Sequence, residues 1–250
     1  MTSAGSGTIP SDFLSRIRAA LDAPANSPPP PDSPPISDPL IRLVGHDDDI
    51  KSRFVSSARA AGMQVHETTP AGALASLRAL LFQLRIDKVT LALLANSPAL
   101  DWESAIRLAG CRIVPWKGTG IRDSHFSVAA GITDCLAAVA ETGSLILASG
   151  QSAGRNAWLV PPLHIALLRT SQILPDLIDA MPLLARPESS RRLPAAVVFV
   201  TGPSKTADIE GILITGVHGP GAVHILLIDD QPPHSSSPAH SPSSTETPPC

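Results

Sequence analysis

Several residue types are scarce in this chain, and each scarcity argues against a class of function. Only 3% of the 250 residues are aromatic, tyrosine is absent, and the net charge is −3 with no block of lysine or arginine. Nucleic-acid binding requires a basic surface, and binding of single strands also uses aromatic rings for stacking. No segment approaches the run of roughly 20 apolar residues that spans a membrane. We therefore expect neither a nucleic-acid partner nor a membrane span.

Cysteine is also scarce, and the three cysteines, Cys111, Cys135 and Cys250, are widely spaced. They cannot supply the four thiolates of an iron–sulfur cluster or a structural zinc within one chain. We therefore expect no metal and no cofactor in this chain. Such cysteine usage is typical of a reducing compartment, and the opening residues lack the pattern of a signal peptide. We expect a cytoplasmic protein in which Cys111 and Cys135 are small core residues.

Proline, in contrast, is abundant, and its 26 residues mark the boundaries of the ordered body. Residues 1–10 are predicted to be disordered, and residues 11–22 form an amphipathic helix that could dock on its own domain or on a partner. A proline-rich linker over residues 23–39 can form neither a helix nor a sheet ladder. One α/β domain is predicted over residues 40–230. A Pro/Ser-rich tail over residues 231–250 has nothing to bury and is predicted to be disordered.

The predicted domain alternates short apolar runs with segments of helical periodicity. Continuous Val/Ile/Leu/Ala strands interleaved with helices predict a three-layer α/β fold, with a mostly parallel sheet and helices on both faces. Strands are predicted at 41–45, 89–94, 112–114, 145–148, 165–168, 196–200 and 224–228. Helices are predicted at 48–61, 70–84, 101–109, 175–184 and 206–214.

A strand followed by Gly202, Pro203 and Ser204 is the first candidate site. With a helix predicted to begin near Thr206, free helical N–H groups would favour an anion. The hydroxyl groups of Ser204 and Thr206 and the ammonium group of Lys205 would complete a phosphate or carboxylate site. The spacing is not that of a P-loop. The alternative is an ordinary capped turn in which Asp208 complements the helix dipole.

The segment Glu141-Thr142-Gly143-Ser144, between two apolar runs, is the second candidate. The Glu141 carboxylate is a candidate nucleophile, general base or substrate-orienting group, with Thr142 and Gly143 beside it in contact with the ligand. The alternative is a solvated β-turn in which Gly143 takes a positive φ and Glu141 is incidental. Polar clusters beside apolar runs are typical of strand ends, where ligands bind in α/β proteins.

Two further residues are candidates. His218 lies in a glycine-framed loop before the last predicted strand, where it could act as an acid–base group or bind an anion. It could equally hold the loop through a backbone hydrogen bond. Arg155 suits bidentate binding of a carboxylate, or it pairs with an acidic neighbour on the surface.

Four segments together resemble the LUD domain of the lactate utilization protein C (LutC/YkgG) family. They are Ala-Val-Ala-Glu-Thr-Gly-Ser-Leu-Ile-Leu (138–147), Leu-Val-Pro-Pro-Leu-His-Ile (159–165), Thr-Gly-Pro-Ser-Lys-Thr-Ala-Asp-Ile-Glu (201–210) and Gly-Val-His-Gly-Pro (216–220). The resemblance implies a subunit without iron–sulfur clusters in a multi-component system that oxidises L-lactate to pyruvate. Iron–sulfur subunits and a small anionic ligand would be its partners.

The same resemblance implies a fold similar to the NagB/RpiA/CoA-transferase-like group. In CoA-transferases of that group a glutamate is the nucleophile, but the correspondence is one of fold and does not assign that role to Glu141. The run from Gly131 to Leu136, which contains Asp134, departs from the pattern expected of the family. Two other functions stay open. One is a free-standing enzyme acting on a carboxylate, phosphorylated or CoA-linked substrate with Glu141 as nucleophile or base. The other is a non-catalytic assembly module.

Overall fold

A computed structural model of the chain describes residues 11–22, 42–45, 49–94, 100–117, 124, 126–150, 153–185, 194–207 and 213–231. The chain divides into two compact units, residues 1–41 and residues 42–250. In the first unit a helix, α1, spans Ser11–Asp22. The disorder predicted for residues 1–10, the linker predicted for residues 23–39 and the tail predicted after residue 231 lie outside the described residues.

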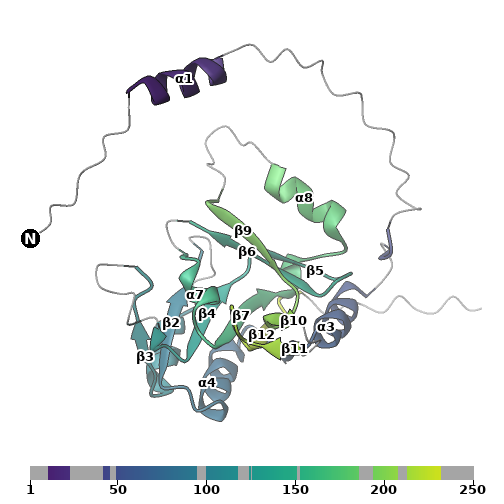
Figure 1. Cartoon of the computed structure of the whole chain (residues 1–250). Helices are drawn as coiled ribbons and strands as arrows, with labels where there is room; N and C mark the ends of the chain where they lie inside the picture. The colour runs from purple at the N-terminus through teal and green to yellow at the C-terminus, as the bar shows by residue number, and fades with distance from the viewer. Residues whose placement is uncertain are drawn as a thin grey trace, which may run out of the picture. The chain divides into compact units, whose positions relative to one another are not determined.

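A six-stranded parallel sheet forms the centre of the second unit (Figure 1). Every pair of neighbouring strands in it is parallel, and the strand order is β1-β12-β7-β4-β2-β3. The strands are β1 (Gln64–Thr68), β12 (Ala222–Ile228), β7 (Leu163–Arg169), β4 (Ala130–Asp134), β2 (Lys88–Ala92) and β3 (Arg112–Val114).

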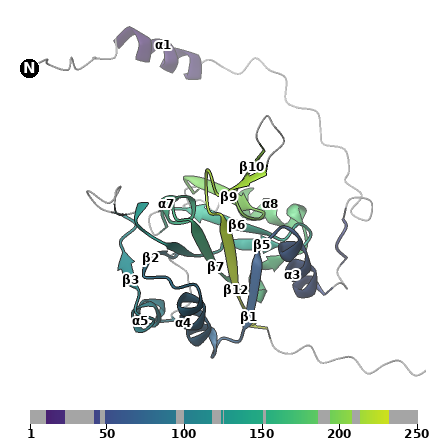
Figure 2. The same cartoon turned by 60° about the horizontal axis from the view of Figure 1, so that its bottom comes forward.

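A second sheet of four strands, in the order β8-β5-β6-β9, packs on one face of this main sheet. Its strands are β8 (Ile173–Leu174), β5 (Ala137–Val139), β6 (Ser144–Ser149) and β9 (Ala196–Val200), and the helices α3 (Ile50–Ala60) and α7 (Asn156–Leu159) pack on the same face. Helix α8 (Leu177–Ala185) contacts β5 and β8 of the second sheet. The helices α4 (Ala73–Gln83) and α5 (Trp102–Leu108) cover the other face of the main sheet (Figure 2).

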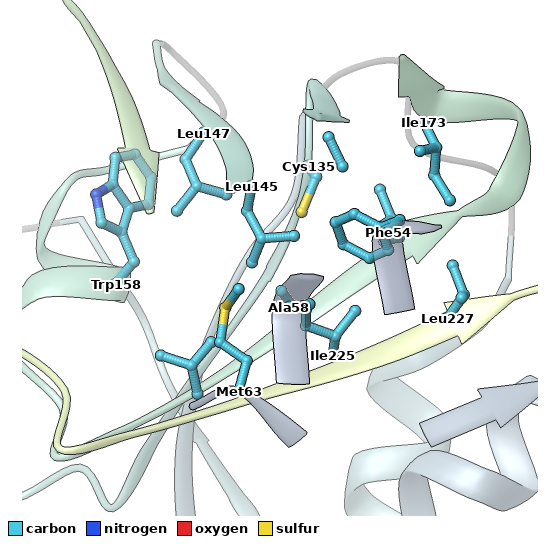
Figure 3. Packing of buried hydrophobic residues seen from close by; sticks show 14 of the residues in the cluster. Phe54, Ala58, Met63, Cys135, Leu145, Leu147, Trp158, Ile173, Ile225 and Leu227 are labelled. Atoms are coloured by element: carbon cyan, nitrogen blue, oxygen red, sulfur yellow. The ribbon is translucent and has the colours of Figure 1, made fainter. Parts of the chain in front are cut away.

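The core between the two sheets is built from alternating strand residues and one side of α3 (Figure 3). Phe54 and Ala58 of α3 are fully buried between Leu145 of β6 and Ile225 of β12. Helix α3 begins where the Asp49 carboxylate accepts a hydrogen bond from the Ser52 N–H, an N-cap that satisfies a free helical donor. The predicted three-layer, mostly parallel α/β fold is confirmed, with the second sheet as an addition to it.

Most of the predicted elements are present with shifted ends, but two are wrong. The helix predicted over residues 206–214 is replaced by an antiparallel hairpin of β10 (Lys205–Ala207) and β11 (Leu213–Thr215). β-Branched Thr206, Ile214 and Thr215 favour this extended backbone. The strand predicted over residues 41–45 is also absent, because residues 42–45 form no strand and Arg42 is instead tied to the start of α8.

Four strands of the two sheets were not predicted, and each has a reason in its sequence. Strand β8 has only two residues. Strand β1 reads Gln-Val-His-Glu-Thr and lacks an apolar run, because it lies at the margin of the main sheet. Strand β4 is interrupted by Gly131 and ends in Asp134. Strand β5 is only three residues long. Short and marginal strands carry too little hydrophobic periodicity to be recognised.

Candidate functional site

Hydrogen bonds join three of the four motif segments closely, and the fourth, residues 159–165, is joined to them through the carbonyl of Pro162. We call residues 141–144, 201–204 and 216–221 the motif junction. The hydroxyl groups of Thr142 and Ser144 lie 2.7 Å apart, and that of Ser144 lies 2.6 Å from the hydroxyl group of Thr201. The N–H of Ser204 donates to the carbonyl of Pro220 at 2.9 Å, and the N–H of Gly216 donates to the carbonyl of Ser204 at 2.8 Å. Hydrogen bonds therefore connect all three segments.

Two glycines of the motif junction lie in close contact with the backbone at the C-terminal end of α3. Gly143 has a φ of 69°, and a Cβ atom there would lie 2.3 Å from the backbone nitrogen of Ala58. Gly202 has a φ of 105°, and a Cβ atom there would lie 2.4 Å from the carbonyl oxygen of Ala61. Both positions combine a left-handed backbone with a contact that leaves no room for a side chain. The two glycines thus have a packing role, which is to clamp the second sheet onto α3.

Glu141 has a fixed backbone and an unengaged carboxylate. Its N–H donates to the carbonyl of Pro175 at 3.0 Å, and its carbonyl accepts from the Ser57 hydroxyl group at 3.2 Å. Within the described part of the chain, the other buried and half-buried carboxylates are engaged by hydrogen bonds or ion pairs, and only that of Glu141 has neither. A rigid backbone that presents an unsatisfied polar group is a feature of preorganised sites.

The first candidate site, around Ser204, lacks the helix N-terminus on which its predicted anion binding depended. Residues 205–207 form a strand, so no helix N-terminus lies beside Ser204, Lys205 and Thr206. The N–H of Ser204 is also already bonded to the carbonyl of Pro220. Anion binding there would rest on the exposed ammonium group of Lys205 and on hydroxyl groups alone. Asp208 lies outside the described residues.

His218 and Arg155 are both exposed and lie on different segments. His218 belongs to the motif junction, whereas Arg155 precedes α7 and its side chain forms no cap. The two segments are joined by a hydrogen bond from the Gly221 N–H to the carbonyl of Pro162 at 2.9 Å. No hydrogen bond or ion pair joins the side chains of Glu141, His218 and Lys205 among the described residues, so their roles as site residues stay predictions.

The motif junction does not lie at the carboxyl ends of the main-sheet strands, although the sequence suggests that position. Residues 216–221 immediately precede β12, and residues 141–144 connect two strands of the second sheet. The crevice that ligands favour in open α/β sheets lies instead where β2 and β4 end, because the chain leaves these neighbours toward opposite faces. There the Asp134 carboxylate accepts from the Leu94 N–H at 2.8 Å.

A pocket of about 390 Å³ lies beside this crevice, between the end of β2 and the start of α5. Leu91, Leu93 and Trp102 form its apolar part, and Asp101 and Arg107 are among its polar residues. The Asp101 carboxylate accepts from the Ser104 hydroxyl group and N–H, and these bonds lower its pKa. No sequence motif marks this pocket, and its position follows only from the order of the strands.

Further along the same edge, the ends of β1, β7 and β12 carry a charged network. Lys51 contacts Asp229 at 2.7 Å and Glu67 at 3.1 Å. The hydrogen bond to Asp229 raises the pKa of Lys51, and the same bond lowers the pKa of Asp229. The hydroxyl group of Thr170 donates to Asp229 at 3.2 Å and to Asp230 at 2.9 Å. A second pocket of about 420 Å³ lies beside Lys51, between α3 and β1.

Two histidines are held neutral inside the sheets. His164 of β7 is bonded to the Thr133 hydroxyl group at 2.8 Å, and burial lowers its pKa to about 4. His224 of β12 is stacked on His66 of β1, with ring nitrogens 3.0 Å apart. Burial, and then the charge of His66, lower the pKa of His224 to about 4. These contacts tie neighbouring strands together.

Cys111 and Cys135 are buried, as predicted for core residues. Burial raises the pKa of both thiols, so each stays protonated. Within the described ranges, no three residues among His, Cys, Asp and Glu are grouped so that they could hold a metal ion. None of the described helices has the length and apolar character needed to span a bilayer.

Comparisons with known proteins give relatives for most of the second unit. A family model described as the LUD domain matches residues 51–228. The chain is 40% identical over 112 residues to lactate utilization protein C 1 of Bacillus mycoides (strain KBAB4), over 44% of this chain and 48% of that protein. It is 39% identical over 94 residues to lactate utilization protein C of Bacillus pumilus (strain SAFR-032), over 37% of this chain and 39% of that protein.

The alignments thus span less than half the length of these curated relatives. Among solved structures, a DUF162 family protein from Deinococcus radiodurans matches with a TM-score of 0.51 and 18% sequence identity. That match covers 78% of this chain and 99% of the other, and at this identity it supports the α/β fold and no more.

Proposed function

Because the chain belongs to the LUD domain family, we propose that it acts in lactate utilization. Its place there is that of a subunit without iron–sulfur clusters, in a multi-component system that oxidises L-lactate to pyruvate. The lactate role is supported by the relatives of this chain, which are named lactate utilization proteins. The burial of Cys111 and Cys135, two thiols that stay protonated, supports placing the clusters on partner subunits.

Within this system we assign the chemistry of the chain to Glu141. The observation that carries this assignment is the half-buried Glu141 carboxylate, which has no partner among the described residues while its backbone is fixed at both ends. Oxidation of L-lactate to pyruvate releases two electrons and two protons. In this proposal the electrons pass to the clusters of the partner subunits, and Glu141 accepts a proton or orients the anionic ligand.

The experiment that tests this proposal is L-lactate-dependent dye reduction in extracts of the native host, with and without the gene. Restored copies would carry Glu141→Gln, Lys205→Ala or no change. Asp87→Asn is a matched control, because Asp87 is an exposed carboxylate far along the chain from the motif junction. We expect activity to vanish with the gene, to return with the unchanged copy and with Asp87→Asn, and to stay absent with Glu141→Gln.

Activity that never depends on the gene would overturn the lactate role. Activity that depends on the gene but survives Glu141→Gln would keep the lactate role and remove Glu141 from the chemistry. In that case the chain would be an assembly module, and it would co-purify with the cluster-bearing subunits irrespective of Glu141.

The same carboxylate favours a second candidate, a free-standing enzyme acting on a small carboxylate, phosphorylated or CoA-linked substrate. This candidate differs from the first in requiring no partner. Purified chain that turns over such a substrate alone, and loses turnover but not binding with Glu141→Gln, would select it.

A further inference from the structure

The two larger sheets end in four marginal strands within the described residues, namely β1, β3, β8 and β9. An open strand edge presents unpaired N–H and carbonyl groups, which recruit strands from other chains. Soluble proteins protect such edges by placing charges on them, by keeping them short or by covering them. An edge without protection therefore indicates that it is paired in the working assembly.

Three of the four edges are protected. At β1 the Arg59 guanidinium donates to the carbonyl of Val65 at 3.4 Å, and Lys51 contacts Glu67 at 3.1 Å. Strand β3 has only three residues and begins with the exposed Arg112. Strand β8 has two residues and contacts α3.

Strand β9 has none of these protections. It reads Ala-Val-Val-Phe-Val over Ala196–Val200, without a charge, a proline or a glycine, and none of its five residues is fully buried. It pairs with β6 on one side only, and no other backbone hydrogen bond to it is found among the described residues. Val200 packs against the core between the sheets, and Val197, on the other face of the strand, packs against the small cluster of Ala137, Ile146 and Ala180. Phe199 lies on the same face as Val197 and is 37% exposed. This is a five-residue apolar edge.

We propose that β9 pairs in antiparallel fashion with β9 of a second copy of this chain. Two four-stranded sheets then join into one sheet of eight strands across a twofold axis. A twofold interface requires a surface that is complementary to itself, and an uncharged strand meets its own copy without repulsion. Pairing centred on Val198 places Phe199 opposite Val197 of the second copy, an aromatic–β-branched pair that stabilises antiparallel strands.

The arrangement of the outer layer favours this occupant. Helix α8 contacts β5 and β8 on the outer face of the second sheet, and its Ala180 belongs to the cluster against which Val197 of β9 packs. Phe199, on the same face as Val197, is still exposed beside the open edge, where the same residue of a second copy would extend this cluster. The proposal does not depend on the lactate role, because it uses only the edge of the second sheet.

The test is the molar mass of the purified full chain in solution, measured by light scattering over a concentration series. We expect a mass twice the 26.0 kDa of one chain. Phe199→Lys should halve the mass. Phe82→Lys is the matched control, because Phe82 of α4 is 82% exposed and lies far from β9 in the fold, and this variant should stay dimeric. Circular dichroism and urea unfolding establish that each variant is folded.

A double variant tests the register. Val197→Glu alone should also halve the mass, whereas Val197→Glu combined with Phe199→Lys should restore the dimer, because the new carboxylate of each copy then faces the new ammonium group of the other. Restoration also separates loss of pairing from loss of folding. A monomeric unchanged chain at all concentrations, a dimer that survives Phe199→Lys, or a double variant that stays monomeric would each overturn the proposal.

Discussion

The motif junction and the carboxyl edge of the main sheet are built from different chemistry. The junction is made of glycines, hydroxyl groups and backbone hydrogen bonds, with one unengaged carboxylate at Glu141. The carboxyl edge carries ion pairs around Lys51 and Asp229 and two surface pockets, but few of the motif residues. Residues that mark a family in sequence are therefore in large part those that hold one layer against another.

The largest effect that would test this comparison is expected at Gly143. Gly143→Ala forces a side chain into the left-handed region and against the Ala58 nitrogen, and we expect it to lower the free energy of unfolding by roughly 2–5 kcal/mol. Gly150→Ala is the control, because a Cβ atom at Gly150 meets nothing within 4 Å. Urea unfolding of both variants measures the difference, and equal stabilities would show that the junction does not clamp α3.

The next largest effect is expected in the pH dependence of stability, through the buried His164. His164 has a folded-state pKa of about 4 against an ordinary 6.5, so the unfolded chain binds more protons between these values. Its contribution is fully present above pH 6.5 and is lost as the pH falls toward 4. We expect this residue alone to lower the free energy of unfolding by about 2 kcal/mol between pH 7 and pH 5.

Urea unfolding at the two pH values checks this expectation. His164→Gln should show a smaller loss of stability between pH 7 and pH 5 than the unchanged chain. His218→Gln, at an exposed position, should leave the loss unchanged. An identical pH dependence in all three proteins would contradict the assignment to His164.

A smaller effect is expected inside the motif junction at Ser144. Ser144→Ala removes the central hydroxyl group between Thr142 and Thr201. We expect a loss of about 1 kcal/mol, because water still reaches the exposed Thr201 and limits the cost of the missing bond. Ser56→Ala, at an exposed site on α3, is the control in the same unfolding experiment. If Ser144→Ala is as stable as Ser56→Ala, the hydroxyl chain does not support the junction.

The smallest effect is expected at the carboxyl edge. Lys51→Met removes two contacts to half-exposed carboxylates, Asp229 and Glu67, and we expect a loss of less than about 1 kcal/mol. The loss should shrink further in 1 M salt, because exposed ion pairs are screened. Arg53→Met, on the same helix and without an ion pair in the described residues, is the control. If Lys51→Met lowers the free energy of unfolding as much as Gly143→Ala does, the carboxyl edge stabilises the fold as strongly as the motif junction, which would contradict the comparison.

The sequence predicted the elements whose hydrophobic periodicity is strong, such as α4, β7 and β12. It missed β1 and β4 of the main sheet, which lack an uninterrupted apolar run. It predicted β6 and β9 as strands but could not predict that they belong to a second sheet, because β5 and β8 are too short to show a pattern. A helix was predicted where β10 and β11 form a hairpin, because the pairing of these two strands outweighs the helical pattern of the sequence. The motif segments lie together in the structure, away from the carboxyl ends of the main-sheet strands where the sequence placed them. The contact of Gly143 and Gly202 with α3 depends on long-range packing, which no local pattern records.

The central claim is that one turn separates two roles, with Gly143 holding the fold and Glu141 performing the chemistry. The most direct test is Glu141→Gln, measured for both urea unfolding and L-lactate-dependent dye reduction with its partner subunits restored. The account predicts a free energy of unfolding within about 0.5 kcal/mol of the unchanged chain, as for substitutions away from packed contacts, together with loss of the lactate-dependent activity. Unchanged activity in a folded Glu141→Gln chain would contradict it.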